Sequence, residues 1–221
     1  SPPSLLPPSL NQISSDGPYL HYKLYVNIKL PEKHKKDICQ KIPIHLIAHP
    51  SSYLHPSFLP VEIENKNHSN IILYASLNEQ TNPIKPGDIC YLNVELHNPK
   101  HAKIKCLSID LIQNRTLWKA GHCSLKIDLS SPPDLQAFSG ENYRETLPLA
   151  IPDDDRVIPS FRYLPSTTSD KPIAVEYVLK LEVKVHGLFN DIVRNIPVIV
   201  HSKQGLYATS LNQDDIKLST Y

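Results

Sequence analysis

Few side chains in this sequence have the types and spacing that catalysis requires. The sequence has no G-x-S-x-G nucleophile motif, no H-E-x-x-H metal motif, no glycine-rich phosphate loop and no dinucleotide fingerprint. His122 and Cys123 are the only adjacent histidine and cysteine, and no second pair completes a zinc site. The acidic run 153–155 could attract a divalent cation, but such a site also needs carbonyl oxygens from a second element. We therefore expect no catalytic residue, no metal site and no cofactor.

Basic side chains are better candidates for binding, because clustered cations can hold phosphate groups through charge-assisted hydrogen bonds. The main cluster lies on a predicted hairpin and comprises Lys100, His101, Lys103 and Lys105. A weaker cluster lies in a predicted turn and comprises Lys33, His34, Lys35 and Lys36. For both clusters, ordinary solvated surface is the competing explanation and the commoner case for exposed lysines. The binding hypothesis is that residues 100–105 dock the protein on an anionic membrane.

Composition limits the classes of partner. The chain has 221 residues, enough for one large or two small domains, and 40% of them are hydrophobic. Its 21 prolines and only 6 glycines suit strands joined by stiff loops. The net charge of +1 gives no bulk attraction to nucleic acid, so no nucleic-acid partner is expected.

The cysteines and the glycosylation sequons point to different compartments. The cysteines are far apart and form no C-x-x-C pair, which favours thiols in a reducing compartment over a disulfide framework. They are Cys39, Cys90, Cys106 and Cys123. Sequons at Asn67 and Asn114 are the main support for the alternative of a secreted, adhesion-type sandwich.

The clearest structural signal is the alternation of apolar and polar residues over 173–185. This period of two predicts a strand with one buried face and one solvent-exposed face. Residues 192–200 are expected to return as its antiparallel partner. Pro197 within that partner has no N–H for a ladder, so an edge or a bulge is expected there.

A similar hairpin is predicted earlier, over 19–30 and 38–47. Each hairpin follows a Pro-Ser step and includes an Ile-Pro-aliphatic step, and matching landmarks lie about 150 residues apart. This repetition suggests a duplicated domain, although chance alternation is the competing explanation. If it is a duplication, the chain is expected to begin part-way through the first copy.

Short strands separated by turn residues continue from residue 70 to about 202, which is typical of an antiparallel β-sandwich. The predicted organisation has four parts. They are residues 1–50, the end of a first sandwich; 51–69, a proline-containing linker; 70–202, a complete sandwich; and 203–221, a polar tail. The fold class expected is all-β.

Several short segments in the predicted sandwich resemble the arrestin family, specifically its C-terminal domain. The opening strands, the following hairpin and the closing strands each carry one or two of these segments. They are 73–78 (LYASLN), 84–88 (IKPGD), 94–99 (VELHNP), 102–105 (AKIK), 158–161 (IPSF) and 175–180 (VEYVLK). The resemblance covers about residues 70–202 and extends to the end of an N-terminal arrestin domain in residues 6–47.

The closing segment looks more like alpha-arrestins and their trafficking relatives than like visual arrestins or beta-arrestins. The resemblance implies an immunoglobulin-like sandwich and a non-catalytic adaptor for membrane-protein sorting, endocytosis or endosome–Golgi traffic. It also implies a cytoplasmic, peripherally membrane-associated protein that binds cargo tails and trafficking proteins. Many alpha-arrestins recruit ubiquitin ligases through Pro-Pro-x-Tyr, which this sequence lacks. A subunit of a larger trafficking complex, such as a guanine-nucleotide exchange complex, is the alternative.

Overall fold

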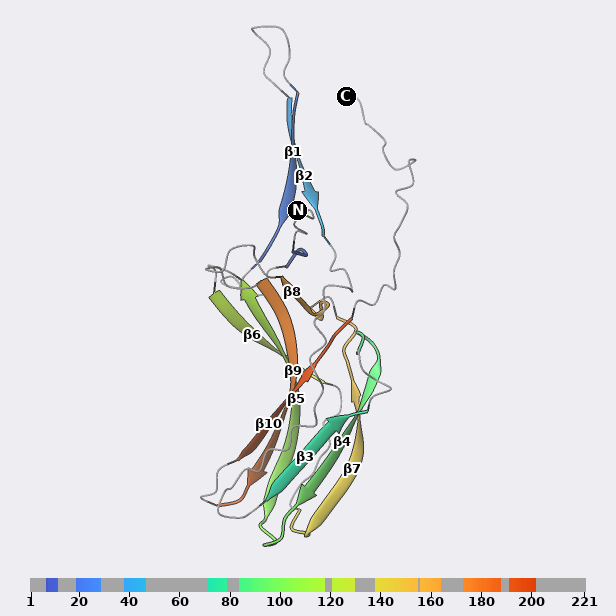
Figure 1. Cartoon of the computed structure of the whole chain (residues 1–221), viewed down its shortest axis with the longest axis vertical. Helices are drawn as coiled ribbons and strands as arrows, with labels where there is room; N and C mark the ends of the chain where they lie inside the picture. Colours follow the sequence, from blue (N-terminus) through green and yellow to red (C-terminus); the bar gives the residue numbers. More distant parts are fainter. Residues whose placement is uncertain are drawn as a thin grey trace.

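In the computed structural model, all regular secondary structure among the described residues is β-strand. The described residues are 7–11, 19–28, 38–46, 71–78, 84–117, 121–129, 138–154, 156–163, 173–187 and 191–201. They form an antiparallel β-sandwich and a separate two-stranded hairpin that projects from one end of it (Figure 1). The all-β prediction is therefore confirmed.

The sandwich consists of a larger and a smaller sheet. The larger runs β10 (Ile192–Val198), β9 (Ile173–Val185), β5 (Ile104–Leu117) and β6 (Gly121–Ile127), with β8 (Phe161–Tyr163) also paired to β9. The smaller runs β3 (Ile72–Leu77), β4 (Ile89–His97) and β7 (Asn142–Ala150). Apolar side chains from both sheets form one buried core between them.

Strand β9 confirms the alternation predicted for 173–185. Tyr177, Leu179 and Leu181 are at most 1% exposed, while Val178 and Lys180 between them lie on the outer face and are half-buried. β10 pairs antiparallel with β9 and forms the outer end of the sheet path, so Pro197 lies in an edge strand as predicted. An edge position tolerates proline because the missing N–H would face away from the ladder.

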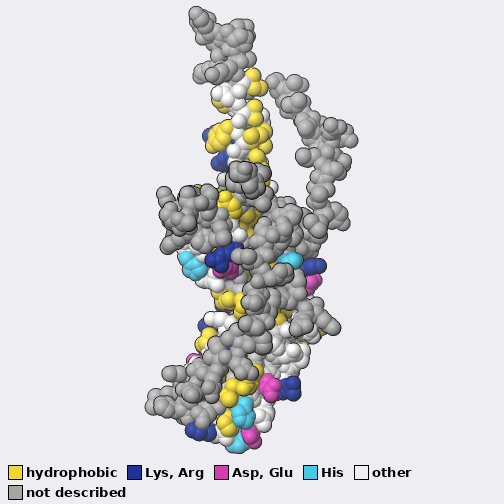
Figure 2. All heavy atoms as spheres, in the orientation of Figure 1, with side chains coloured by type: hydrophobic (Ala, Val, Ile, Leu, Met, Phe, Trp, Pro, Cys, Tyr) yellow, Lys and Arg dark blue, Asp and Glu magenta, His cyan; other side chains and the backbone are white. Residues whose placement is uncertain are grey.

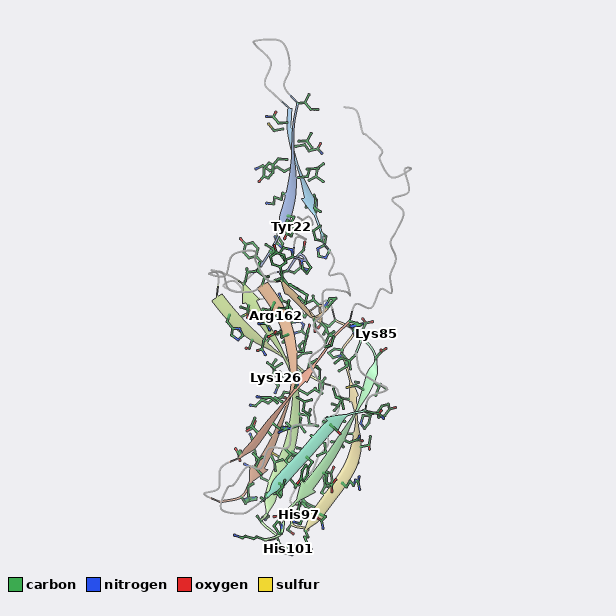
Figure 3. The ribbon with its side chains drawn as sticks, viewed as in Figure 1. Tyr22, Lys85, His97, His101, Lys126 and Arg162 are labelled. Carbon is green, nitrogen blue, oxygen red and sulfur yellow. The ribbon has the colours of Figure 1, made fainter. Side chains whose placement is uncertain are left out.

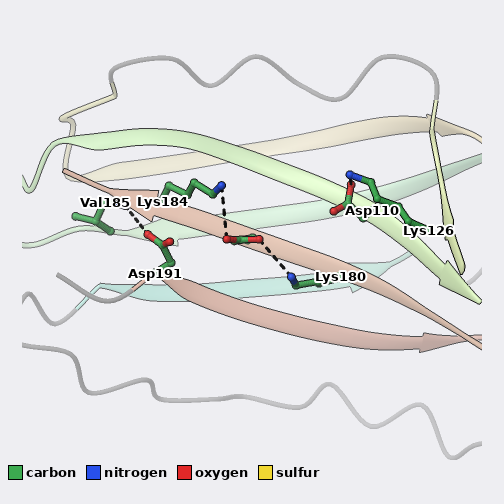
Figure 4. Close-up of polar contacts among 7 residues, drawn as sticks. Asp110, Lys126, Lys180, Lys184, Val185 and Asp191 are labelled. Atoms are coloured by element: carbon green, nitrogen blue, oxygen red, sulfur yellow. Dashed lines mark hydrogen bonds and ion pairs between the residues drawn. The ribbon is translucent and has the colours of Figure 1, made fainter. Parts of the chain in front are cut away.

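The outer face of the larger sheet carries ion pairs, one between strands β5 and β6 and two within strand β9 (Figure 4). Lys126 Nζ lies 2.9 Å from Asp110 Oδ1, and Glu182 lies between Lys180 at 3.3 Å and Lys184 at 3.8 Å. Because these groups are partly solvated, each pair contributes only about 0–1 kcal/mol. The buried face supplies most of the stability of this sheet.

The two sheets differ in length. β5 has 14 residues and β9 has 13, whereas β4 and β7 have 9 each. The end of β5 that pairs with β6 lies toward the projecting hairpin (Figure 1). There, other segments complete the core in place of the smaller sheet, and Leu10 is fully buried among them.

The hairpin joins β1 (Tyr22–Ile28) to β2 (Ile38–Ile44) in a regular antiparallel register. Its apolar side chains share one face, as the alternation predicted. That face is nevertheless open: Leu24 is 49% exposed and Ile28 is 52% exposed (Figure 2). The alternation in the sequence determines which side chains share a face of the hairpin. A two-stranded ribbon has no second layer of its own, so nothing within the hairpin buries its apolar face.

Candidate functional site

The main basic cluster lies on the turn between β4 and β5, at the end of the sandwich opposite the hairpin (Figure 3). Asn98 organises this turn and is fully buried. Its Nδ2 donates to the carbonyls of Ala102 at 2.9 Å and Gly140 at 3.0 Å, and its Oδ1 accepts the Ala102 N–H at 3.0 Å. The His101 N–H donates to the Asn98 carbonyl, which closes the turn at 3.0 Å.

The backbone around the turn is also fixed from outside. His101 has φ of 52°, in the left-handed region that few residues other than glycine adopt. The Asn98 N–H donates to the Glu141 carbonyl, and the His186 N–H donates to the Lys103 carbonyl at 2.8 Å. We call residues 97–105 the β4–β5 tip. Its backbone is held by hydrogen bonds while its basic side chains remain exposed.

All four residues of the predicted cluster lie on the β4–β5 tip, and all four are exposed. Lys100, His101 and Lys103 come from the turn itself. Lys105 sits at a register shift between Ile104 and Cys106, a bulge that leaves it outside the inward alternation. His97 and His186 add two imidazoles at the same end, and the exposed Glu141 adds a negative charge. The tip is therefore basic but not uniformly so.

Of the other candidates from the sequence, some lie outside the described residues and the rest form no metal-binding group. Residues 33–36 lie outside the described part of the chain, as does Asp155. Asp154 accepts from the Arg156 Nε at 2.6 Å, and hydrogen bonding to Arg156 holds the pKa of this carboxyl below its usual value. His122 is exposed and contacts Thr116 Oγ1 at 3.4 Å. Within the described residues, no three His, Cys, Asp or Glu side chains are grouped to hold a metal ion.

The structure also brings together polar residues that sequence analysis did not select. Gln113 and Arg115 face inward from β5 and are at most 1% exposed. Arg194 faces inward from β10, is 5% exposed, and has no hydrogen-bond partner at Nε or Nη1 among the described residues. Desolvation lowers the pKa of both arginines. The sequence did offer one indication of these residues. Each occupies a position in its strand where the alternation places a buried apolar side chain, and a polar residue is unusual there.

No helix among the described residues is long and apolar enough to cross a membrane.

This chain has similar counterparts among the solved structures. A structural match, at a TM-score of 0.38 and 13% identity, is Spo0M, a sporulation control protein from Bacillus subtilis. That match covers 59% of this chain and spans half of the length of Spo0M. No curated protein matches the sequence significantly.

The family comparison covers more than half of the chain. Residues 67–204 match the model of the family described as arrestin (or S-antigen), C-terminal domain. The matched region contains all eight strands of the described sandwich, from β3 to β10. It also includes every segment on which the resemblance was based. The chain therefore belongs to the arrestin family, through its C-terminal domain.

Proposed function

We propose that this chain is a non-catalytic adaptor that holds membrane-protein cargo and trafficking proteins during sorting, endocytosis or endosome–Golgi traffic. Membership of the arrestin family supports a binding role in general. The described sandwich offers edge strands in both sheets, along which an extended peptide can add main-chain hydrogen bonds. The proposed setting is the cytoplasmic surface of an endosome, the Golgi or the plasma membrane.

The observation that supports membrane association most directly is the β4–β5 tip. Asn98 and its neighbours fix the backbone, so lysine side chains are presented from a preorganised base. Preorganisation reduces the entropy lost on binding. Each lysine near an anionic bilayer contributes about 1 kcal/mol, so three of them contribute about a hundredfold in affinity. We infer that the tip contacts anionic lipid headgroups.

Vesicle co-sedimentation tests this role. The variant Lys100→Glu, Lys103→Glu, Lys105→Glu is compared with the unchanged protein on phosphatidylcholine vesicles with and without a phosphoinositide. We expect the unchanged protein to bind only the phosphoinositide vesicles, and the variant to lose about a hundredfold in affinity or more. Added salt should weaken binding by the unchanged protein because exposed charges are screened.

A charge-matched control separates local contact from net charge. The variant Lys23→Glu, Lys41→Glu, Lys85→Glu makes the same charge change at exposed positions on the hairpin and before β4. It should retain binding if the β4–β5 tip is the contact. Equal loss in both variants, or unchanged binding by the tip variant, would remove the membrane contact from the proposal.

The open hairpin face favours a second candidate, a subunit of a larger trafficking complex. Ile42 and Ile44 are 39% and 40% exposed on the same face as Leu24. An apolar sheet face of this kind is normally covered by another layer. An N-terminal arrestin-like sandwich or a partner chain could supply it. Purified protein that stays monodisperse alone favours the adaptor, and protein that requires a second polypeptide to stay monodisperse favours the complex.

A further inference from the structure

The joint between the hairpin and the sandwich is made by a short segment, residues 7–11. Leu10 and Leu20 exchange both backbone hydrogen bonds at 2.9 Å, next to the start of β1. The Ser9 N–H donates to the Leu46 carbonyl at 2.8 Å, and the Leu46 N–H donates to Ser9 Oγ at 2.9 Å. The segment is thus attached to the base of the hairpin on both sides.

The same segment is also part of the sandwich, although it lies far outside the family-matched region 67–204. Leu10 is fully buried in the common core. The next carbonyl, that of Asn11, accepts a hydrogen bond from Arg115 Nη1 at 2.7 Å. Among the described residues, Arg115 on β5 thus makes a direct polar contact from the sandwich to the segment that carries the hairpin.

Arg115 belongs to a buried network whose acceptors are neutral. Its Nε donates to Gln113 Oε1 at 2.7 Å. Gln113 Nε2 donates to the Arg156 carbonyl at 2.8 Å and to the Tyr177 hydroxyl, which in turn donates to the Ile158 carbonyl at 2.6 Å. The network joins β5, β9 and residues 156–158 to residue 11.

Because Arg115 is charged and buried, its free energy depends on whether residues 7–11 are in place to accept its hydrogen bond. A guanidinium stays protonated in proteins, and burying one without a carboxylate costs several kcal/mol that only good hydrogen bonds offset. Arg115 is 1% exposed, and no described carboxylate is paired with it. If the Asn11 carbonyl withdraws, water has to replace it. The joint is therefore expected to be either fully formed or open and hydrated.

We propose that Arg115 is a latch that positions the hairpin on the sandwich. When its bond to the Asn11 carbonyl is made, residues 7–11 and the hairpin base are fixed to β5 through the buried network. When that bond is lost, residues 9–11 and the Leu20 and Leu46 contacts open together, while the two sheets of the sandwich stay paired. Arg115 is a positioning residue for the joint rather than a support of the sandwich itself.

Amide hydrogen exchange on the full chain tests the latch, with Arg115→Met compared with the unchanged protein. We expect exchange at Leu10, Leu20 and Leu46 to become about tenfold to a hundredfold faster, the range for losing a buried hydrogen bond to a charged group. Amides between β4 and β7 should accelerate much less than the joint amides, although Arg115→Met also removes the donor to Gln113 Oε1. Arg115→Lys keeps the charge but cannot bond Gln113 and Asn11 in fork geometry, so an intermediate effect is expected.

Arg162→Met is the matched control. Arg162 is an exposed arginine on β8 whose Nη1 lies 3.4 Å from Glu176, so its loss should leave the joint amides unchanged. The latch is refuted if Arg115→Met leaves the Leu10 and Leu20 amides protected. Equal acceleration of the β4–β7 amides, or failure of the variant to fold, also refutes it, because either result assigns Arg115 to the sandwich.

Discussion

Tyr177 on β9 offers a quantitative test of the buried network. Its hydroxyl donates to the Ile158 carbonyl at 2.6 Å and accepts from Gln113 Nε2, and the residue is 1% exposed. Burial raises the pKa of the phenol, so the hydroxyl remains protonated and able to donate at neutral pH. Tyr177→Phe removes these two bonds and leaves the ring in place.

The expected cost follows from which groups lose a partner. Gln113 Nε2 keeps its bond to the Arg156 carbonyl, whereas the Ile158 carbonyl loses the Tyr177 donor. Leaving one buried polar group unsatisfied costs about 1–3 kcal/mol, so the free energy of unfolding should fall by about 2 kcal/mol. For a chain of this size that corresponds to a decrease in melting temperature of about 4–8 °C.

Urea denaturation followed by circular dichroism measures this change. Tyr74→Phe is the matched control, because Tyr74 is 40% exposed on β3 and should lose less than about 0.5 kcal/mol. The pair Tyr177→Phe and Gln113→Leu should be non-additive by about 0.5 kcal/mol or more, since they share a bond. If Tyr177→Phe behaves like Tyr74→Phe, the network does not contribute to stability as argued.

Two further predictions concern a buried thiol and the turn. Burial raises the pKa of the Cys90 thiol from 9.0 to about 11, so the folded state holds this proton more tightly than the unfolded state. That contribution is present below about pH 9 and is lost as pH rises toward 11, a decline of about 2–3 kcal/mol. Urea titrations across this range should show a shallower decline in Cys90→Ala, and identical slopes would contradict the assignment. Asn98→Ala removes the side-chain bonds to Ala102 and Gly140, so it should lower the free energy of unfolding by about 3 kcal/mol and accelerate exchange of the Ala102 amide. A protected Ala102 amide in Asn98→Ala would show that the turn does not depend on this side chain.

Much of the sandwich followed from local pattern. Alternation over 173–185 gave β9 and its buried face, because side-chain direction in a strand alternates whatever the partner is. The same reasoning placed Cys90, Leu92 and Val94 inside, where they are at most 1% exposed. The proline in β10 indicated an edge because a missing N–H weakens any central ladder.

The basic cluster was predictable as a set of residues but not as a surface. The order of Lys100, Lys103 and Lys105 along a turn was visible in the sequence. The bulge at Lys105, the buried Asn98 support and the approach of His186 depend on β7 and β9, which pair with β4 and β5 from far along the chain. Whether these lysines bind lipid stays a prediction.

The sequence by itself determined where strands form and which side of each is apolar, because a period of two is a local property of the chain. The tertiary structure alone decided which apolar faces are covered. The β9 face meets a second sheet, whereas the Leu24 face of the hairpin does not. It also decided the partners of buried polar groups: Arg115 meets the Asn11 carbonyl across a separation of 104 residues. No local pattern encodes such a contact, because it arises only when the ends of long strands extend past a shorter sheet and must be closed by another part of the chain.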